Sequence, residues 1–128
     1  MKSKLPRPTD AELQILNVLW ERGPSTVRQV VDTLKSSRSP GYTTVLKLLQ
    51  IMMDKGLVLR DESTRTHIYR VKQPKQQTQK QLLGEVLTRA FGGSANQLVM
   101  QALQIKKLSA DELSEIRNLL DGLEDTSQ

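Results

Sequence analysis

Cysteine is absent from this chain of 128 residues, and aromatic residues make up only 3% of it. Without thiols the protein has no disulfide, no thiolate metal site and no cysteine nucleophile, which is typical of a reducing compartment. No stretch approaches the ~18 apolar residues of a membrane span, and no apolar run follows the basic N-terminus as in a signal peptide. We therefore expect a soluble cytoplasmic protein with a core of Leu, Val, Ile and Met.

The sequence also has little that suggests catalysis or phosphate binding by a glycine loop. The single histidine, His67, lies in a β-like run beside Arg65, with no carboxylate or second ligand at a useful spacing. Gly92-Gly93 is not followed by the lysine and hydroxyl of a phosphate loop. The acidic pairs Asp61-Glu62 and Asp111-Glu112 are typical of a turn and a helix start. The sequence predicts no catalytic residue, no metal site and no cofactor, so we do not expect an enzyme.

Charge is present but unevenly distributed. The net charge is +5, yet residues 1–75 hold 14 Lys/Arg against 7 Asp/Glu, whereas residues 76–128 hold 5 against 7. A basic half beside a mildly acidic half indicates a polyanion-binding module joined to a region with another role. On charge alone, chance variation of the surface explains the pattern equally well.

Two helices are predicted at the start of the chain. The capping box Thr9-Asp10-Ala11-Glu12 predicts the beginning of the first, and Gly23-Pro24 predicts its end. Apolar residues then recur at helical spacing from Val27 to Leu34, with Ser25 as the expected N-cap. The polar residues 35–38 form a turn after this second helix.

A third helix is predicted over about residues 39–55. Ser39 suits the N-cap, Pro40 suits the first helical position, and Gly56 follows the last helical residue as a C-terminal glycine does. On a helical wheel its apolar face is wide, and a narrow polar stripe lies opposite. Taken alone, this stripe is more typical of the solvated edge of a core helix than of a binding surface. The stripe holds Thr43, Lys47, Gln50 and Asp54, with Thr44 to one side.

Two short β-like runs follow, residues 57–60 and 66–71, separated by a polar segment with Arg65 at its tip. This pattern predicts an antiparallel hairpin, or wing, over residues 57–71. Three helices and a hairpin in a basic half indicate a winged helix-turn-helix DNA-binding domain over residues 1–75, so the fold class is mainly α with a small β wing.

This context favours DNA contact by the third helix. Threonine hydroxyls can meet base edges or phosphates, and lysine and arginine can meet phosphates. We expect the helix start in the major groove and the wing on the DNA backbone. The candidate DNA-binding residues are Arg38, Pro40, Gly41, Tyr42, Thr43, Thr44, Lys47, Arg65, Thr66 and His67.

The second half, residues 76–128, reads as three helices. Pro74 and the glutamine-rich residues 76–81 mark its boundary; apolar helical spacing resumes at Leu82, and further helices start at Ser94 and at the capping box Ser109–Glu112. Three helices of this size lack enough internal contact to be stable alone. We expect them to form a homodimer, the alternative being that they fold back onto the first half. The candidate dimerisation residues are Leu82, Leu83, Val86, Leu87, Leu98, Val99, Leu103, Leu113, Ile116 and Leu120.

The chain resembles the penicillinase-repressor family of the BlaI/MecI type. The residues that carry the resemblance are 7-RPTDAELQILNVLWERGPSTVRQVV-31, 40-PGYTTVLKLLQIMMDKGLVLR-60 and the leucine-rich helices that follow. The Leu-x-Ile-Leu-x-x-Leu-Trp opening and the Tyr-Thr-Thr-Val helix are its most specific parts, and the likeness extends from about residue 5 to residue 123.

This resemblance implies a dimeric bacterial repressor that binds a double-stranded operator and is relieved when a sensor-linked protease cuts its C-terminal helices. The family's usual cleavage pair is asparagine–phenylalanine, and the matching position here is Gln101-Ala102. A copper-responsive relative uses a C-terminal cysteine cluster, which a chain without cysteine does not have.

One other function fits the same fold, namely a winged-helix adaptor that binds RNA or another protein without operator specificity. Trp20 and Tyr42 are the aromatic residues on which RNA bases would stack, but Trp20 lies on an apolar helix face and fits the core. Steep loss of duplex-DNA affinity with rising salt separates a repressor from such an adaptor.

Overall fold

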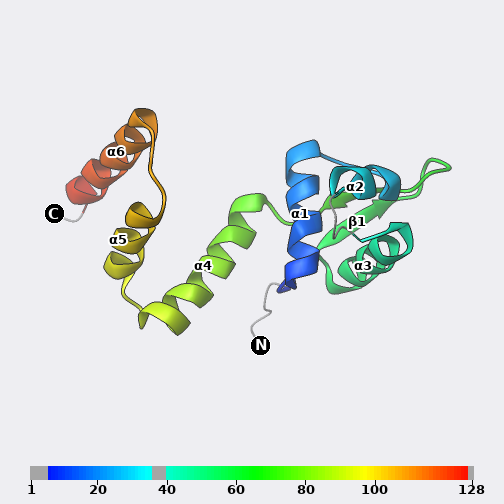
Figure 1. Cartoon of the computed structure of the whole chain (residues 1–128), viewed down its shortest axis with the longest axis horizontal. Helices are drawn as coiled ribbons and strands as arrows, with labels where there is room; N and C mark the ends of the chain where they lie inside the picture. Colours follow the sequence, from blue (N-terminus) through cyan, green and yellow to red (C-terminus); the bar gives the residue numbers. More distant parts are fainter. Residues whose placement is uncertain (1–5, 36–39, 127–128) are drawn as a thin grey trace. The chain divides into compact units, whose positions relative to one another are not determined.

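The computed structural model describes residues 6–35 and 40–126. The chain divides into two compact units, Met1–Leu83 (unit 1) and Gly84–Gln128 (unit 2). In chain order the elements are three helices, a two-stranded sheet and three further helices (Figure 1). The predicted fold class, mainly helical with a small β wing, is confirmed.

Helix α1 (Asp10–Arg22) begins with the predicted capping box. Thr9 Oγ1 accepts a hydrogen bond from Glu12 N at 3.2 Å, and Thr9 N donates to Glu12 Oε1 at 2.9 Å. The helix ends at Gly23, whose φ of 91° is a left-handed value that glycine adopts without steric cost.

Helix α2 (Val27–Thr33) is capped by Thr26, so the prediction of Ser25 as its N-cap is wrong. Thr26 Oγ1 accepts from Gln29 N at 3.1 Å, while Gln29 Oε1 accepts from Thr26 N at 2.9 Å. The Ser25 hydroxyl instead donates to the carbonyl of Gly23, and its backbone pairs with Tyr69. Thr26 and Gln29 thus form a capping box, and the N-cap of α2 lies one residue later than predicted.

Helix α3 (Tyr42–Lys55) starts two residues after the position predicted for Pro40. Gly41, in an extended conformation, occupies the N-cap, and its carbonyl accepts the first helical bond from Val45 N at 3.0 Å. Ser39, the expected N-cap, lies outside the described residues. Gly56 ends the helix as predicted, with a left-handed φ of 85°.

The predicted hairpin is present, with shorter strands. Strand β1 (Val58–Asp61) pairs antiparallel with β2 (Ile68–Val71), in a register that sets Val58 opposite Val71 and Asp61 opposite Ile68. Together with residues 62–67 these strands form the wing, which projects from unit 1 (Figure 1).

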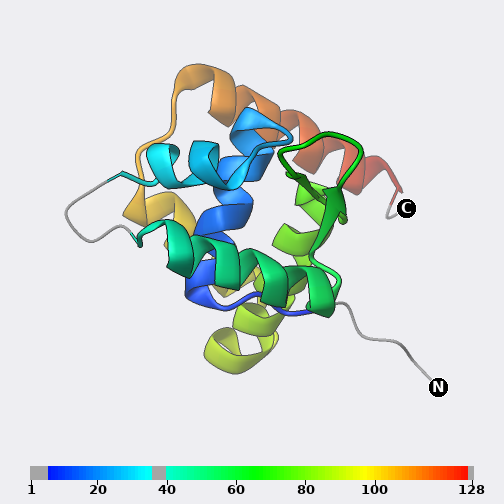
Figure 2. The same cartoon turned by 90° about the vertical axis from the view of Figure 1, so that its right-hand side faces the viewer.

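In the core of unit 1, one face of each of α1, α2 and α3 packs against the base of the wing. Trp20 packs against this core, as its position on the apolar face of α1 predicts. Figure 2 shows α2 and α3 side by side in front of α1. The buried hydrophobic residues are Ile15, Leu16, Val18, Leu19, Val27, Val30, Val45, Leu49, Met52, Leu57, Val58 and Tyr69.

Helix α4 (Lys75–Phe91) starts earlier than predicted, because the glutamine-rich residues 76–81 are helical. Glutamine and lysine are good helix formers, and Pro74 precedes the first turn. Within unit 1, Thr78 is buried and Gln81 Nε2 donates to the carbonyl of Pro6 at 3.3 Å. The division expected after residue 75 falls at the start of α4, and unit 1 extends to Leu83.

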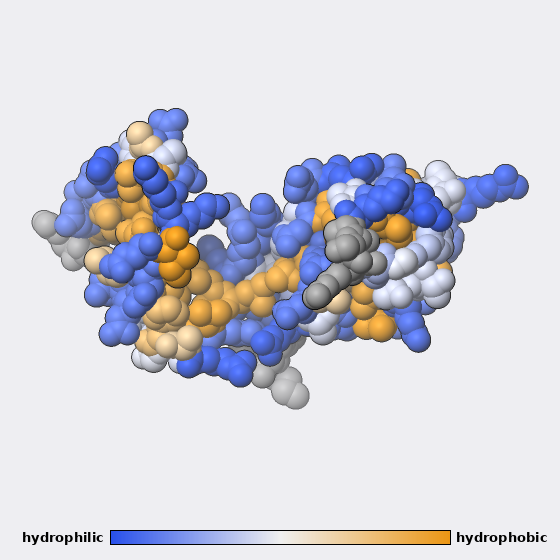
Figure 3. All heavy atoms as spheres, viewed as in Figure 1, coloured by the Kyte–Doolittle hydropathy of each residue, from blue (hydrophilic) through white to orange (hydrophobic). Residues whose placement is uncertain are grey.

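Unit 2 contains the end of α4, α5 (Ala95–Ile105) and α6 (Ala110–Thr126). Ser94 caps α5, and the predicted capping box of Ser109 and Glu112 begins α6, with bonds of 2.9 and 3.1 Å. No described residue of α5 or α6 is buried. Hydrophobic side chains are therefore left on the surface of unit 2, and Figure 3 shows them gathered over α5 and α6.

Candidate nucleic-acid interface

The start of α3 exposes the predicted polar stripe. Tyr42, Thr43, Thr44 and Lys47 are all exposed, whereas Val45 in the same turn is fully buried. The buried face anchors the helix to the core, so its exposed side chains have a fixed orientation. This surface offers hydroxyl groups and one ammonium group in the first two turns.

The tip of the wing exposes Arg65, Thr66 and His67. No residue in the described part of the chain other than glycine has a positive φ, so the tip turns without a left-handed residue. Side chains stabilise the turn instead: Asp61 Oδ1 accepts from Ser63 N at 2.9 Å, and Thr64 Oγ1 donates to the Thr66 carbonyl at 2.7 Å.

The acidic residues of the wing have local partners. Glu62 Oε2 accepts from Arg60 Nε at 2.7 Å. Hydrogen bonds with the Tyr69 hydroxyl and with Glu62 raise the pKa of Arg60. Hydrogen bonds from Ser63 lower the pKa of Asp61, so this carboxylate is charged and bound to its own turn. The charge of Arg60 reduces the repulsion that the Glu62 carboxylate would exert on a polyanion.

The base of the wing is joined to the residue before α2. Ser25 N donates to Tyr69 O at 2.9 Å, and Tyr69 N donates to Ser25 O at 2.8 Å. Both residues are buried. This two-bond bridge fixes the wing against the first turn of α2, within unit 1.

A hollow of about 300 Å³ lies between α2, the start of α3 and the wing, and is called here the wing hollow. Its inner part is formed by Val27, Leu46 and Tyr69, which are buried or half-buried. Its remaining described lining carries polar groups: Thr26, Arg28, Tyr42, Arg65, Thr66 and His67.

An ion pair fixes the far end of α3. Lys55 Nζ lies 2.6 Å from Glu12 Oε1 and also donates to the carbonyl of Arg7 at 2.9 Å. Burial of Glu12 raises its pKa, but hydrogen bonds from Lys55 and Thr9 outweigh this effect, and the pKa lies below its ordinary value of 4.5. The carboxylate therefore links the start of α1 to the end of α3.

The structure brings four of the predicted DNA-binding residues to one hollow of unit 1. Tyr42, Arg65, Thr66 and His67 share the wing hollow, and Gly41 directly precedes Tyr42. Arg38 lies outside the described residues.

Arg28 is a residue that the sequence analysis missed. Its guanidinium carbon lies 5.0 Å from the centre of the Tyr42 ring, and it lines the wing hollow. Arg28 lies off the face of α2 that Val27 and Val30 bury, and this position is the signal that could have marked it as an exposed cation.

Among the predicted dimerisation residues, Leu82, Leu87, Leu98 and Ile116 are half-buried. The others are exposed on α4, α5 and α6: Leu83, Val86, Val99, Leu103, Leu113 and Leu120. Gln101 and Ala102, the predicted cleavage pair, are exposed within α5.

Within the ranges that the structure describes, no cluster of three His, Asp or Glu residues could hold a metal ion. The same residues contain no helix that is long and apolar enough to cross a membrane.

Three helices followed by a wing define unit 1 as a winged helix-turn-helix unit. The fold is similar to the solution structure of the DNA binding domain of the repressor BlaI, with a TM-score of 0.50 and 22% identity over 58% of this chain and 90% of that one. The family described as Penicillinase repressor matches residues 8–122. The chain belongs to this family of transcriptional repressors.

Two relatives show how far the similarity extends. Transcriptional regulator BlaI of Mycobacterium tuberculosis is 32% identical over 123 residues, which cover 95% of this chain and 88% of the relative. The penicillinase repressor of Bacillus licheniformis is 23% identical over 118 residues, 92% of each chain. Both alignments include unit 2 as well as the winged-helix unit.

Proposed function

We propose that the protein is a dimeric, sequence-specific DNA-binding repressor that acts in the bacterial cytoplasm. The observation that carries the proposal is the hydroxyl-rich, exposed start of α3 beside the basic tip of the wing, on a unit whose residues are net positive. The names of the relatives, a transcriptional regulator and a penicillinase repressor, support it.

In this proposal α3 enters the major groove with its N-terminal turns. Thr43 and Thr44 donate to or accept from base edges, and their methyl groups can contact a thymine methyl. Lys47 lies one turn further along the same exposed stripe and binds a phosphate. The buried face of the helix, through Val45 and Leu49, sets the register of these contacts.

The wing binds the DNA backbone beside α3. Arg65 supplies a guanidinium group for phosphate oxygens, and Thr66 and His67 supply further hydrogen-bonding groups. Because phosphate contacts carry no base information, the wing raises affinity for every sequence, and α3 supplies the discrimination.

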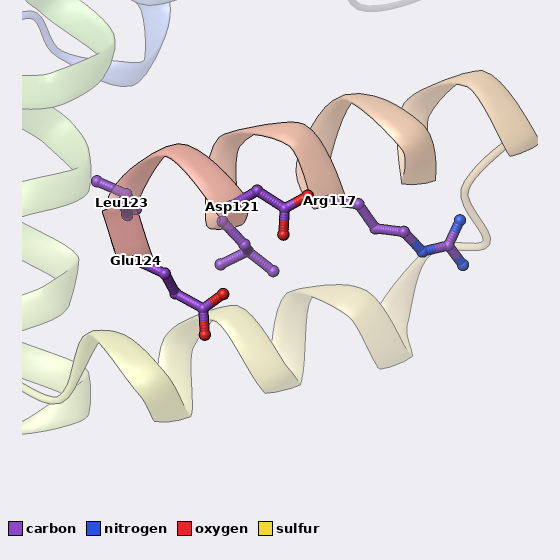
Figure 4. Close-up of a pocket in the computed structure, with 5 residues that line it drawn as sticks. Arg117, Asp121, Leu123 and Glu124 are labelled. Atoms are coloured by element: carbon purple, nitrogen blue, oxygen red, sulfur yellow. The ribbon is translucent and has the colours of Figure 1, made fainter. Parts of the chain in front are cut away.

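Unit 2 forms the dimer. Its exposed apolar residues would otherwise remain in water, at a cost of about 25 cal/mol per Å². On α6 they border an open hollow of about 570 Å³ lined by Arg117, Leu120, Asp121, Leu123 and Glu124 (Figure 4). A second copy of the chain offers the same leucines and a two-fold arrangement, so both apolar surfaces are covered together.

Two linked units on one duplex bind far more tightly than one, because the second contact becomes intramolecular. The dimer then occupies two half-sites about 34–36 Å apart, or a multiple of that spacing.

Proteolysis by a sensor-linked protease relieves repression. A cut between Gln101 and Ala102 separates Leu103 and all of α6 from the rest of the chain. The dimer surface is then divided, and affinity for the operator falls. Because both residues lie inside a helix, this part of α5 must unwind before a protease that binds extended chain can cut it.

Selection of bound fragments from the source genome tests the proposed function. The full-length protein should enrich double-stranded fragments that share an inverted repeat, and a band shift on such a fragment should show two chains per duplex. Enrichment of RNA, or of fragments with no common sequence, would refute operator binding.

A further inference from the structure

The wing hollow combines basic side chains with buried apolar residues in its lining. Of the residues that line it, Arg28 and Arg65 carry guanidinium groups and His67 an imidazole, and among its described lining residues none is acidic. Val27 and Tyr69 in its inner part are buried. A charge at such a site is less screened than on an open surface, so the hollow favours an anion.

The acidic residues of the wing next to its tip have other partners. Glu62 is hydrogen-bonded to Arg60 and Asp61 to Ser63. Neither carboxylate lines the hollow. Arg28 and Arg65 bring guanidinium groups to the hollow from two different elements, α2 and the wing.

The hollow is preformed by two contacts. The Ser25–Tyr69 bridge holds the wing against the start of α2 with bonds of 2.9 and 2.8 Å. The Tyr42 ring lies under the guanidinium of Arg28, whose central carbon is 5.0 Å from the ring centre. A cation over an aromatic face is attracted by the ring's electron density, so Arg28 has a preferred position before any ligand binds.

We propose that the wing hollow binds one phosphate group of the DNA backbone, with Arg28 as a direct contact and Tyr42 as the residue that positions it. The proposal rests on the DNA-binding function above and adds a site between α2, α3 and the wing. A guanidinium presents two parallel N–H groups to two phosphate oxygens, which a lysine cannot do. Tyr42 thereby acts through Arg28 rather than on a base.

The test uses full-length protein and two labelled duplexes, one carrying a genome-selected operator and one of random sequence, titrated over a series of salt concentrations. Arg28→Gln should weaken binding to both duplexes roughly tenfold. It should also lower the slope of log affinity against log salt by about 0.9 for each subunit bound, leaving the ratio between the duplexes unchanged. Arg28→Lys should keep the slope and lose affinity.

Tyr42 is tested through its coupling to Arg28. Tyr42→Leu should weaken binding to both duplexes, and Tyr42→Phe, which keeps the ring, should not. Adding Tyr42→Leu to Arg28→Gln should cause no further loss. Arg22→Gln removes the same charge from an exposed position on α1 outside the hollow and should leave the salt slope unchanged. Matching thermal unfolding curves establish that the variants are folded.

Two results would overturn the proposal. If Arg28→Gln kept the wild-type salt slope, Arg28 would not bind a phosphate group. If Arg28→Gln changed the ratio of operator to random affinity, Arg28 would contact a base instead. The proposed function fails differently, through wild-type protein that binds neither duplex.

Discussion

At the scale of single residues, the start of α3 separates exposed from buried positions within one turn. Thr43 and Thr44 are exposed and Val45 is buried, so their side chains are held outward by a helix that cannot rotate without exposing its core face. Small changes at the exposed positions should therefore alter recognition without altering the fold.

Thr43→Ala and Thr44→Ala should each lower discrimination between operator and random DNA by about 1–3 kcal/mol, because each removes a hydroxyl that we propose binds a base edge. Competition binding at one fixed salt concentration measures it. Lys47→Ala and Arg65→Ala are the comparison, because removal of a phosphate-binding group weakens binding to all sequences alike. If all four variants bound both DNAs like the wild type, the assigned site would be wrong.

Glu12 has a structural role, at the opposite end of α3. Its carboxylate is buried, accepts from Thr9 N and pairs with Lys55, and its pKa is lowered. A carboxyl with a lowered pKa in the folded state contributes stability above its unfolded pKa. That contribution is lost as the pH falls from the unfolded pKa, near 4.5, through the lower folded value.

Glu12→Gln should reduce the free energy of unfolding at neutral pH by about 1–3 kcal/mol, because Gln keeps an acceptor for Thr9 but leaves Lys55 without its counter-charge. Below pH 4.5 the variant should lose less stability than the wild type. Denaturant unfolding monitored by the fluorescence of Trp20, the only tryptophan, measures both effects. Glu21→Gln, on the exposed side of the same helix, is the control; an equal loss there would contradict the assigned role of the ion pair.

At the scale of elements, sequence signals predicted the helix starts that depend on side-chain caps. The boxes at Thr9 and Ser109 and the cap at Ser94 are all present. The prediction was wrong at Ser25, because the pairing of its backbone with Tyr69 is a long-range interaction that local sequence does not reveal. The predicted start of α4 was too far along the chain, because the apolar spacing begins at Leu82 whereas the helix begins at Lys75. Apolar spacing marks only the part of a helix that has an apolar face.

The site was predicted in the same uneven way. The stripe on α3 follows from helical periodicity, and the basic tip of the wing follows from the hairpin pattern. The wing hollow does not, because it requires the distance between Arg28 and Tyr42, which lie on different helices. Contacts between elements depend on packing angles that no local pattern encodes.

The cap of α2 gives a prediction at this scale. Thr26→Ala should destabilise unit 1 by about 1 kcal/mol, because the amide of Gln29 loses its acceptor. The midpoint of urea unfolding, followed by Trp20 fluorescence, measures the change. Thr26→Ser keeps the hydroxyl and should retain most of the stability; a loss as large as that of the alanine variant would mean that the hydrogen bond is not the cause.

At the scale of the whole molecule, the two units differ in what they bury. Unit 1 has a continuous core of residues from α1, α2, α3 and the wing. In α5 and α6, by contrast, every described residue is at least partly exposed, although both helices carry leucines. We expect the missing burial in unit 2 to come from a second chain.

Leu120→Glu should convert the proposed full-length dimer to a monomer, because a charged carboxylate would enter the apolar surface that we propose lies between subunits. Sedimentation velocity over a range of protein concentrations measures the change. Asn118→Glu adds the same charge to the polar side of α6 and should leave the dimer intact. A Leu120→Glu protein that remained dimeric would place the interface elsewhere.

The most direct test of the central claim is the affinity of the full-length protein for a genome-selected duplex as salt rises from about 50 to about 200 mM. Several phosphate groups bound by each of two subunits predict a steep loss of affinity; about 6–10 phosphates in all correspond to about 10³–10⁵-fold. Single-stranded RNA of the same sequence should bind far more weakly. Affinity that did not change with salt, or a preference for the RNA, would contradict the conclusion that this protein is a repressor that binds duplex DNA.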